Sequence, residues 1–400
     1  MSITLSKESL VFGYKASQTT LGKGAYGQVI LITRMSDGAP LIAKISHLAE
    51  KIPTLTRKYA ENVSLEGRIL RHIQADYFIE LTSGEHLEKA SGIQAEQSVL
   101  IMRSLDPNGV GDFYRRYLDQ KGVKKPFCAQ NCAELLPAIR QLQTIVESKQ
   151  IIHGDIKPEN ILPEGVIDFG FAQALDFRDN YALGIKKQPL FGTPWYRGPE
   201  MWLRVFQSGL AATYTANLTE VYDVWSLGAT LFELITDRPL FPVRDEVFNA
   251  SIVFYSLLKN SNFAVPHWMN RAVAARLKGE WTPDELVEQG WIDKEGYSLI
   301  QKFSLKNHNV SEYVELSLLE KERKLFVNEC RALEQEYQKD RENPKYMELL
   351  QSLREKRAQN EAMARALGAC VASMLMVDPI LRPSMKEVHQ QLTLIVHGEG

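Results

Sequence analysis

The sequence has little cysteine, no long hydrophobic run and no large charge excess. Four cysteines among 400 residues are too few for a disulfide scaffold, and they indicate reduced thiols in a cytosol-like compartment. No apolar run reaches the roughly 18 residues of a membrane helix, and residues 1–13 lack the basic and apolar regions of a signal peptide. The formal net charge of −2 argues against bulk nucleic-acid binding. We therefore expect a soluble chain without a membrane span, acting in the cytoplasm.

The densest group of chemically active side chains lies between residues 153 and 170. Asp155, Lys157 and Asn160 fall within six residues, and Asp168 follows, two residues before Gly170. In phosphoryl transfer, one carboxylate accepts the proton of the acceptor hydroxyl and a lysine offsets the charge of the moving phosphate. An amide and a second carboxylate hold magnesium. The residues of this stretch could fill these roles, although the stretch could also be a charged loop between two short strands.

A glycine-rich turn precedes the first predicted strands. Gly22, Gly24 and Gly27 form a G-x-G-x-x-G pattern, and residues 28–34 after it are apolar and β-branched. A dinucleotide-binding turn would need a helix directly after the glycines. A strand follows instead, so we favour a hairpin whose bare backbone N–H groups approach phosphate oxygens.

Lys44 ends the next predicted strand, residues 41–45. Alone it would read as an ordinary exposed lysine, but the upstream glycines favour a lysine that reaches the α- and β-phosphates and needs a carboxylate partner. Residues 54–73 predict a helix with Thr54 as N-cap. On this helix we favour Glu66 over Glu61 as the partner, because Glu66 adjoins the apolar face.

Residues 98–102 predict a further strand, which breaks at a turn-rich segment, 103–109, that suits a hinge between two lobes. If the phosphates belong to an adenine nucleotide, the adenine would meet backbone groups of this hinge, and Met102 would lie just behind the base. Apolar spacing from Leu135 to Val146 predicts an amphipathic helix bracing the residue 153–170 stretch. Two short strands, 161–162 and 166–167, follow.

Seven motifs in order resemble those of the eukaryotic-type protein kinases. The matching stretches are Gly22–Val29, Ile42–Lys44 with Glu66, His153–Asn160, Asp168–Gly170, Gly192–Glu200, Asp223–Gly228, and Asp378–Pro379 with Arg382–Ser384. Lys157 and Thr193 resemble the serine/threonine branch. The resemblance implies an α+β, bilobal fold with a small β-rich N-lobe and a large helical C-lobe, and a phosphotransferase acting on protein hydroxyls.

The resemblance also implies roles for individual residues. Asp155, Lys157, Lys44 and Glu66 would be catalytic, with Asn160 and Asp168 as ligands of Mg²⁺. Arg382 would pair with Glu200. ATP would be bound by Leu21, Gly22, Gly24, Gly27, Val29, Ala43, Lys44, Met102, Leu105 and Leu162.

Two features depart from the family pattern in the same direction. Gly154 stands where most members carry the arginine that binds a phosphate on the activation segment. Between Gly170 and Gly192 there is no serine or threonine, and Tyr181 is the only hydroxyl-bearing residue. We therefore expect a kinase that does not require phosphorylation of this segment.

Other interpretations stay open at this point. His-Gly-Asp also occurs in small-molecule kinases, although these generally lack the segment resembling Gly192–Glu200. A pseudokinase scaffold is a rival from a different class, although every metal and phosphate ligand is present. The atypical regulation would also suit a bacterial effector acting in a host cytosol.

A helical insertion is expected in the C-terminal half. Phe241-Pro242 and Arg382 lie much farther apart than is usual in the family, so we place the insertion at about 260–365, within a C-lobe of 103–400 that follows an N-lobe of 1–102. A helix is expected near Thr282 to Gly290. Two long helices, from Ser311 to about 338 and from Lys345 to 376, should form an antiparallel hairpin. Its charged faces suit solvated surface or an arm that docks a partner.

Overall fold

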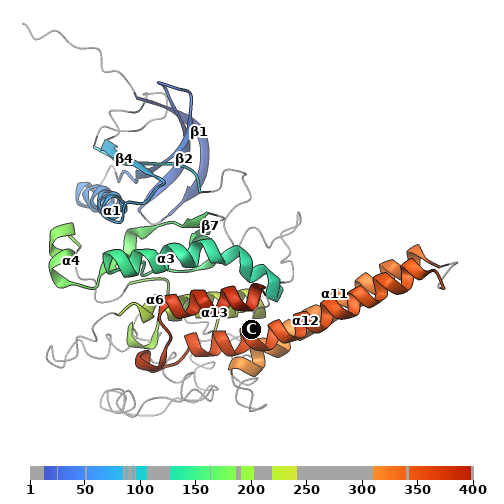
Figure 1. The fold of residues 1–400 in the computed structure, drawn as a ribbon. Coiled ribbons are helices and arrows are strands. Elements are labelled where there is room, and N and C mark those ends of the chain that lie inside the picture. The colour runs from blue at the N-terminus through green and yellow to red at the C-terminus, as the bar shows by residue number, and fades with distance from the viewer. Residues whose placement is uncertain are drawn as a thin grey trace, which may run out of the picture. The chain divides into compact units, whose positions relative to one another are not determined.

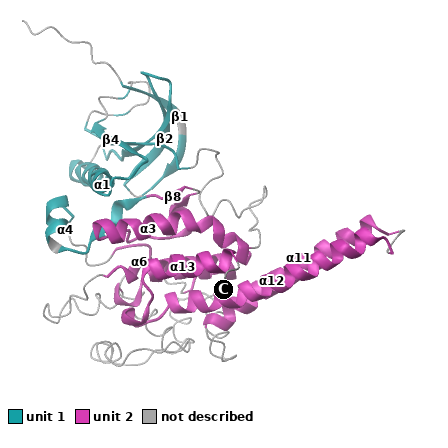
Figure 2. Ribbon diagram, viewed as in Figure 1, with its two compact units in different colours: residues 1–109, 168–186 teal, residues 110–167, 187–400 magenta. Residues whose placement is uncertain are grey.

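The fold is described from a computed structural model. It describes residues 13–24, 26–49, 52–83, 87, 93, 96–105, 127–162, 164–185, 191–201, 219–240, 310–338 and 342–397. The chain divides into two compact units (Figure 2). The first consists of Met1–Gly109 and Asp168–Lys186, and the second of Val110–Ile167 and Lys187–Gly400.

The first unit is built on a five-stranded antiparallel sheet with the strand order β1-β2-β3-β5-β4 (Figure 1). Its strands are β1 (Tyr14–Lys23), β2 (Gly27–Arg34), β3 (Pro40–Ser46), β4 (Phe78–Ser83) and β5 (Ser98–Met102). Residues that alternate along the strands, such as Ile30 and Ile32, bury one face of the sheet, as a period of two predicts. Strand β4 was missed by the sequence analysis.

Helix α1 (Pro53–His72) covers part of this sheet and buries Val63, Glu66, Ile69 and Leu70. Our expectation of Thr54 as its N-cap is wrong. Ile52 holds that position without a side-chain cap and Pro53 opens the helix, a place where the missing N–H of proline costs nothing. The rest of the unit contains the short elements η5 (Phe169–Phe171), β9 (Gln173–Ala174) and α4 (Phe177–Leu183).

The second unit is largely helical. Its helices are α3 (Leu136–Lys149), α6 (Val221–Thr236), α11 (Val310–Glu336), α12 (Pro344–Met374) and α13 (Met385–His397). Its shorter elements are η3 (Ala129–Leu135), β6 (Ile151–Ile152), η4 (Pro158–Asn160), β7 (Ile161–Leu162), β8 (Gly165–Val166), η6 (Pro194–Tyr196) and η7 (Pro379–Leu381). Helix α6 is buried along nearly its whole length and forms the centre of this unit. In the described parts of the chain, no helix is long and apolar enough to cross a bilayer.

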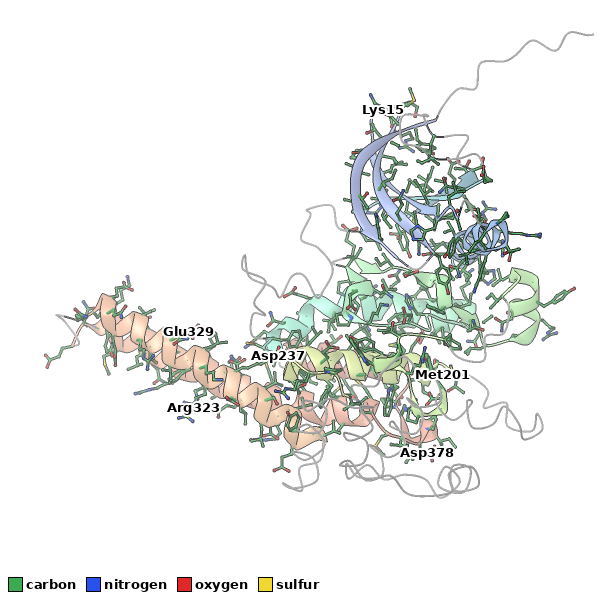
Figure 3. The ribbon with its side chains drawn as sticks, turned by 180° about the vertical axis from the view of Figure 1, so that it is seen from behind. Lys15, Met201, Asp237, Arg323, Glu329 and Asp378 are labelled. Atoms are coloured by element: carbon green, nitrogen blue, oxygen red, sulfur yellow. The ribbon has the colours of Figure 1, made fainter. Side chains whose placement is uncertain are left out.

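Helices α11 and α12 form the predicted antiparallel hairpin, which extends away from the other helices of this unit (Figures 1 and 3). The base of the hairpin is part of the core. Val314 and Leu318 of α11 and Leu367 and Val371 of α12 are fully buried, and Tyr313 stacks on Phe232 of α6 at 5.8 Å between ring centroids. The predicted helix near Thr282 lies outside the described residues.

Candidate active site

The glycine-rich stretch forms the turn between β1 and β2. The amide of Gly24 donates to the carbonyl of Gly27 at 2.8 Å and closes the turn. Gly22 pairs with Val29 across the hairpin. Leu21 at the edge of the turn is exposed, whereas Ala43 and Met102 are buried on the neighbouring strands β3 and β5.

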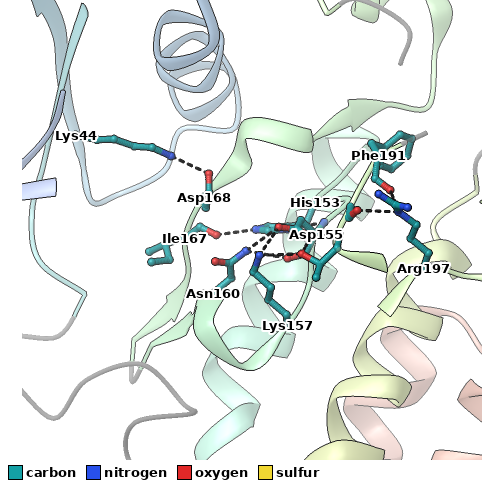
Figure 4. Close-up of polar contacts among 11 residues, drawn as sticks. Lys44, His153, Asp155, Lys157, Asn160, Ile167, Asp168, Phe191 and Arg197 are labelled. Carbon is teal, nitrogen blue, oxygen red and sulfur yellow. Dashed lines mark hydrogen bonds and ion pairs between the residues drawn. The ribbon is translucent and has the colours of Figure 1, made fainter. Parts of the chain in front are cut away.

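Lys44 is the charged centre of the first unit. It lies on β3 between Val29 of β2 and Leu100 of β5. Its ammonium is 2.6 Å from Oε2 of Glu66. The same ammonium is 2.8 Å from Oδ1 of Asp168 (Figure 4). Burial alone would lower the pKa of Lys44, but the two carboxylates outweigh burial and the pKa is raised. The lysine is therefore held as a cation.

Glu66 is the helix carboxylate that contacts this lysine. Its side chain is 2% exposed, and burial raises its pKa against the pull of Lys44. Glu61, the competitor on the same helix, instead pairs with the exposed Arg57 at 3.2 Å. A buried carboxylate without a cation would be costly, so Glu66 and Lys44 fix each other's position.

Asp168 begins the segment that follows Ile167 and returns to the first unit. Its backbone is left-handed, with a φ of 66°, a conformation that few residue types other than glycine, aspartate and asparagine tolerate. Its carboxylate is 41% exposed and keeps access to solvent while it contacts Lys44. Phe169, next in sequence, is fully buried and anchors the segment.

In the second unit, Asp223 of α6 holds the backbone of the 153–160 stretch. Its Oδ2 accepts from the amide of His153 at 2.6 Å, and its Oδ1 accepts from the amide of Gly154 at 2.9 Å. Complete burial raises the pKa of Asp223, and the two backbone amides that donate to its carboxylate oppose that rise. The contacts bind this stretch to the buried core helix.

His153 links the two ends of the same stretch. Its Nδ1 accepts from the amide of Asp155 at 3.2 Å, so Nε2 carries the proton and donates to the carbonyl of Ile167 at 2.9 Å. Asn160 closes the loop from the other side, because its backbone amide and carbonyl bond to Lys157 and Ile167. The residue before Asp168 is thereby fixed to the loop that carries Asp155.

Asp155 is the carboxylate on which most contacts converge (Figure 4). Its Oδ1 accepts from the amide of Thr193 at 2.6 Å and from the Thr193 hydroxyl at 2.7 Å. Its Oδ2 lies 2.9 Å from the ammonium of Lys157. Asn160 donates its side-chain amide to the carbonyl of Asp155 at 2.9 Å and to Oδ2 at 3.4 Å. The carboxylate is 2% exposed and held from several sides.

Two glycines allow this close arrangement. Gly154 has a φ of 81° and Gly192 a φ of 79°, values that disfavour any side chain. A Cβ on Gly192 would lie 2.6 Å from the carbonyl oxygen of Gly154. Glycine at position 154 therefore lets the backbone adopt a left-handed conformation without strain. The sequence alone did not reveal this role.

The expected pair of Arg382 with Glu200 is confirmed. The guanidinium donates to both carboxylate oxygens, at 2.7 and 2.8 Å, and lies over the ring of Trp225 at 4.9 Å. Arg197 donates to the carbonyl of Gly192 at 2.8 Å. These buried contacts fix the segment that positions Thr193 against Asp155.

Comparison with known proteins decides the family. A family model described as "Protein kinase domain" matches residues 15–393. The chain belongs to the protein kinase family. Its fold class is accordingly the expected α+β one, with a β-rich N-lobe and a helical C-lobe. A solved kinase domain, PF14_0431, matches with a TM-score of 0.55 and 16% identity over 93% of each chain, which supports the fold alone.

Curated protein kinases are similar over a little more than half of the chain. Mitogen-activated protein kinase 12 of Oryza sativa subsp. japonica is 27% identical over 59% of this chain and 37% of its own length. Serine/threonine-protein kinase PKH2 of Saccharomyces cerevisiae is 29% identical over 57% of this chain and 20% of its own length. Cyclin-dependent kinase-like 4 of Homo sapiens is 27% identical over 60% and 55%. The chain thus spans a fifth to just over half of these relatives.

Proposed function

We propose that the chain is an ATP- and Mg²⁺-dependent protein kinase that transfers the γ-phosphoryl group of ATP to serine or threonine hydroxyls of a protein. The observation that carries the proposal is the set of contacts on Asp155. A carboxylate fixed by Thr193 and Lys157 is a base of defined orientation. One of the similar chains named above, PKH2, is described as a serine/threonine-protein kinase.

Asp155 accepts the proton of the acceptor hydroxyl while the oxygen of that hydroxyl forms a bond to the γ-phosphorus. The bond from that phosphorus to the β-phosphate oxygen breaks, and ADP leaves. Lys157, whose ammonium also donates to the Thr193 hydroxyl at 2.9 Å, offsets negative charge on the transferred group. Fixed groups of this kind lower the barrier by positioning and electrostatics rather than by covalent chemistry.

Lys44, held by Glu66, positions the α- and β-phosphates. Its raised pKa keeps it charged at any physiological pH, which suits an anion-binding role. The glycine-rich turn between β1 and β2 supplies backbone N–H groups to the same phosphates. Leu21, Val29, Ala43, Met102, Leu105 and Leu162 are proposed to line the adenine site.

The residues proposed for magnesium fit that ion chemically. Magnesium prefers hard oxygen ligands. Asp168 offers a partly exposed carboxylate, and Asn160 uses its amide nitrogen on Asp155, which leaves its amide oxygen for a cation. Bound magnesium would neutralise charge on the phosphates.

We further propose that the kinase acts without phosphorylation of the segment after Asp168. The segment is ordered by its own contacts. Asn180 of α4 is buried and bonds both the amide and the carbonyl of Ala174, at 2.9 and 2.5 Å. Arg68 of α1 donates to the carbonyl of Leu183 at the end of α4, at 3.0 Å. A cation at a helix C-terminus is favourable, and this contact links α1 to the segment with no phosphate.

The test is transfer of labelled phosphate from ATP to a generic acceptor protein with Mg²⁺, by the wild-type chain and by Asp155→Asn. The variant keeps the size of the side chain but cannot accept the proton, so we expect a rate lower by at least a hundredfold, with label on serine or threonine. Absence of transfer by the wild-type chain under varied metal and acceptor would favour a pseudokinase scaffold. Transfer to a small molecule alone would favour a small-molecule kinase.

A further inference from the structure

The tip of the β1–β2 turn is held by a histidine that follows β3. The backbone amide of His47 donates to the carbonyl of Tyr26 at 2.9 Å, which continues the ladder beyond the Gly27–Ser46 pair. The imidazole Nε2 lies 2.8 Å from the carbonyl of Gly24. A carbonyl oxygen can only accept, so Nε2 donates. One residue therefore binds two carbonyls of the glycine-rich turn.

Aromatic side chains pack against one another beside the same tip of the β1–β2 turn. The ring of Tyr59 on α1 meets His47 edge-on, with 5.6 Å between centroids and an interplanar angle of 83°. Tyr59 also meets Tyr26 at 6.5 Å, and Tyr26 meets Phe171 at 6.4 Å, both at 67°. These separations lie in the range of attractive edge-to-face contacts. We call His47, Tyr59, Tyr26 and Phe171 the loop clamp.

The segments that supply the clamp also place the phosphate-binding charges. His47 closely follows Lys44, Tyr59 lies two helical turns before Glu66, and Phe171 closely follows Asp168. All of these residues belong to the first unit. The clamp therefore ties the glycine-rich turn to the β3, α1 and η5 segments that hold the Lys44, Glu66 and Asp168 triad.

We propose that His47 and Tyr59 are positioning residues that hold the glycine-rich turn ready for the phosphates of a nucleoside di- or triphosphate; this rests on the proposed ATP binding. Phosphate oxygens are attracted by backbone N–H groups and repelled by carbonyl oxygens. His47 forms hydrogen bonds to the carbonyls of Gly24 and Tyr26 and keeps both pointing toward the end of β3. A turn that is already ordered also loses less conformational entropy when the ligand binds.

The test is the affinity of the full-length chain for Mg-ADP and for adenosine, measured by titration calorimetry. The variants are His47→Ala, His47→Gln and Tyr59→Ala, with His72→Ala as the matched control at the end of α1. Adenosine has no phosphate, so its binding does not depend on the phosphate-binding N–H groups of the turn. We expect Mg-ADP to bind His47→Ala and Tyr59→Ala roughly threefold to tenfold more weakly, as for loss of one neutral hydrogen bond or ring contact. Adenosine affinity should stay within about twofold of the wild type.

His47→Gln should recover part of the loss, because its amide can donate to the Gly24 carbonyl. Unchanged Mg-ADP affinity in both His47→Ala and Tyr59→Ala, or an equal loss for adenosine, would overturn the clamp and leave the proposed function standing. A wild-type chain that binds neither ligand would overturn both. Circular dichroism identifies any variant that fails to fold, in which case the remaining variants decide.

Discussion

Thr193 is the residue whose side chain most directly fixes the proposed base. Its hydroxyl donates to Oδ1 of Asp155 and accepts from Lys157. Hydrogen bonds to charged groups contribute about 1.5–3 kcal/mol. Thr193→Val keeps the shape and removes these bonds, so kcat should fall roughly tenfold to a hundredfold, whereas Thr193→Ser should stay near the wild-type rate.

Steady-state kinetics with saturating ATP measure this effect. The KM for ATP should change little in either variant, because Thr193 contacts the base rather than the proposed nucleotide-binding residues. Equal rates for Thr193→Val and the wild type would show that the hydroxyl does not orient Asp155.

Predictions for single residues were confirmed where helix register or a family motif determines the partner of a charged side chain. The pairing of Lys44 with Glu66 rather than Glu61 followed from the register of one helix, and the Arg382–Glu200 pair followed from the resemblance. The contact of Thr193 with Asp155 and the left-handed backbone of Gly154 were not predicted. The Thr193–Asp155 contact joins residues far apart in sequence, which local patterns do not bring together, and a glycine alone does not reveal that its φ is positive.

At the scale of elements, Arg68 of α1 contacts the end of α4, and the proposed independence from phosphorylation rests partly on this contact. Arg68→Ala removes the hydrogen bond to Leu183. Losing a bond of about 0.5–1.5 kcal/mol should speed amide exchange in α4 by about twofold to tenfold. Hydrogen–deuterium exchange of residues 177–185 measures it.

Arg57→Ala is the matched control, because Arg57 lies on the same helix and forms an exposed pair with Glu61. It should leave exchange in α4 unchanged. If Arg68→Ala also left it unchanged, the contact would not order the segment.

The α11–α12 hairpin has two parts with different surroundings. Near its base, Asn360 donates to Glu322 at 2.7 Å, and Lys321 binds Asp237 at 2.9 Å and the carbonyl of Ile235 at 2.6 Å. Farther out, Glu329 lies on the projecting part (Figure 3). The base therefore belongs to the lobe core, and the outer part extends from it.

Two deletions separate these parts. Replacing residues 327–353 by a short glycine-serine link should leave the thermal midpoint within a few degrees of the wild type and spare transfer to a generic acceptor. Deleting residues 312–365 removes buried side chains of the core and should prevent folding. A soluble, active chain after the larger deletion would contradict this assignment. Selective loss of partner binding with the shorter deletion would support a docking arm.

The sequence predicted the hairpin well because its helices are long and periodic. Both were placed within about two residues of their observed bounds. Strand β4 was not predicted, because it is short and all of its residues are half-buried. Its sequence therefore shows little alternation between apolar and polar residues. That the hairpin base joins the core could not be foreseen, because its partners on η3 and α6 lie far away in sequence.

At the scale of the whole molecule, thiol reactivity reports whether the second unit is packed as described. Burial and the neighbouring Glu322 raise the pKa of Cys128 to about 12, and burial raises that of Cys370 to about 12. Burial also raises the pKa of Cys132. The pKa of Cys330 is raised as well, by burial and by Glu334 and Glu329, but Cys330 is only partly buried and its thiol is therefore accessible to a reagent. Thiolate is the reactive form, so one fast thiol is expected in the native chain at pH 8.

A colorimetric thiol reagent measures this directly. All four cysteines should react in denaturant, and Cys330→Ser should remove the fast phase. Two or more fast thiols in the native chain would show that the core around α12 and η3 is open.

The most direct test of the central proposal is phosphoryl transfer by protein treated with a broad phosphatase. The wild-type chain, shown by mass spectrometry to carry no phosphate on residues 170–192, is given labelled ATP, Mg²⁺ and a protein acceptor, beside Asp155→Asn. We predict that the treated chain keeps its full rate while the variant loses at least about a hundredfold, which is roughly 2.7 kcal/mol of transition-state stabilisation. A large loss of rate after phosphatase treatment, or equal rates for the wild type and Asp155→Asn, would contradict it.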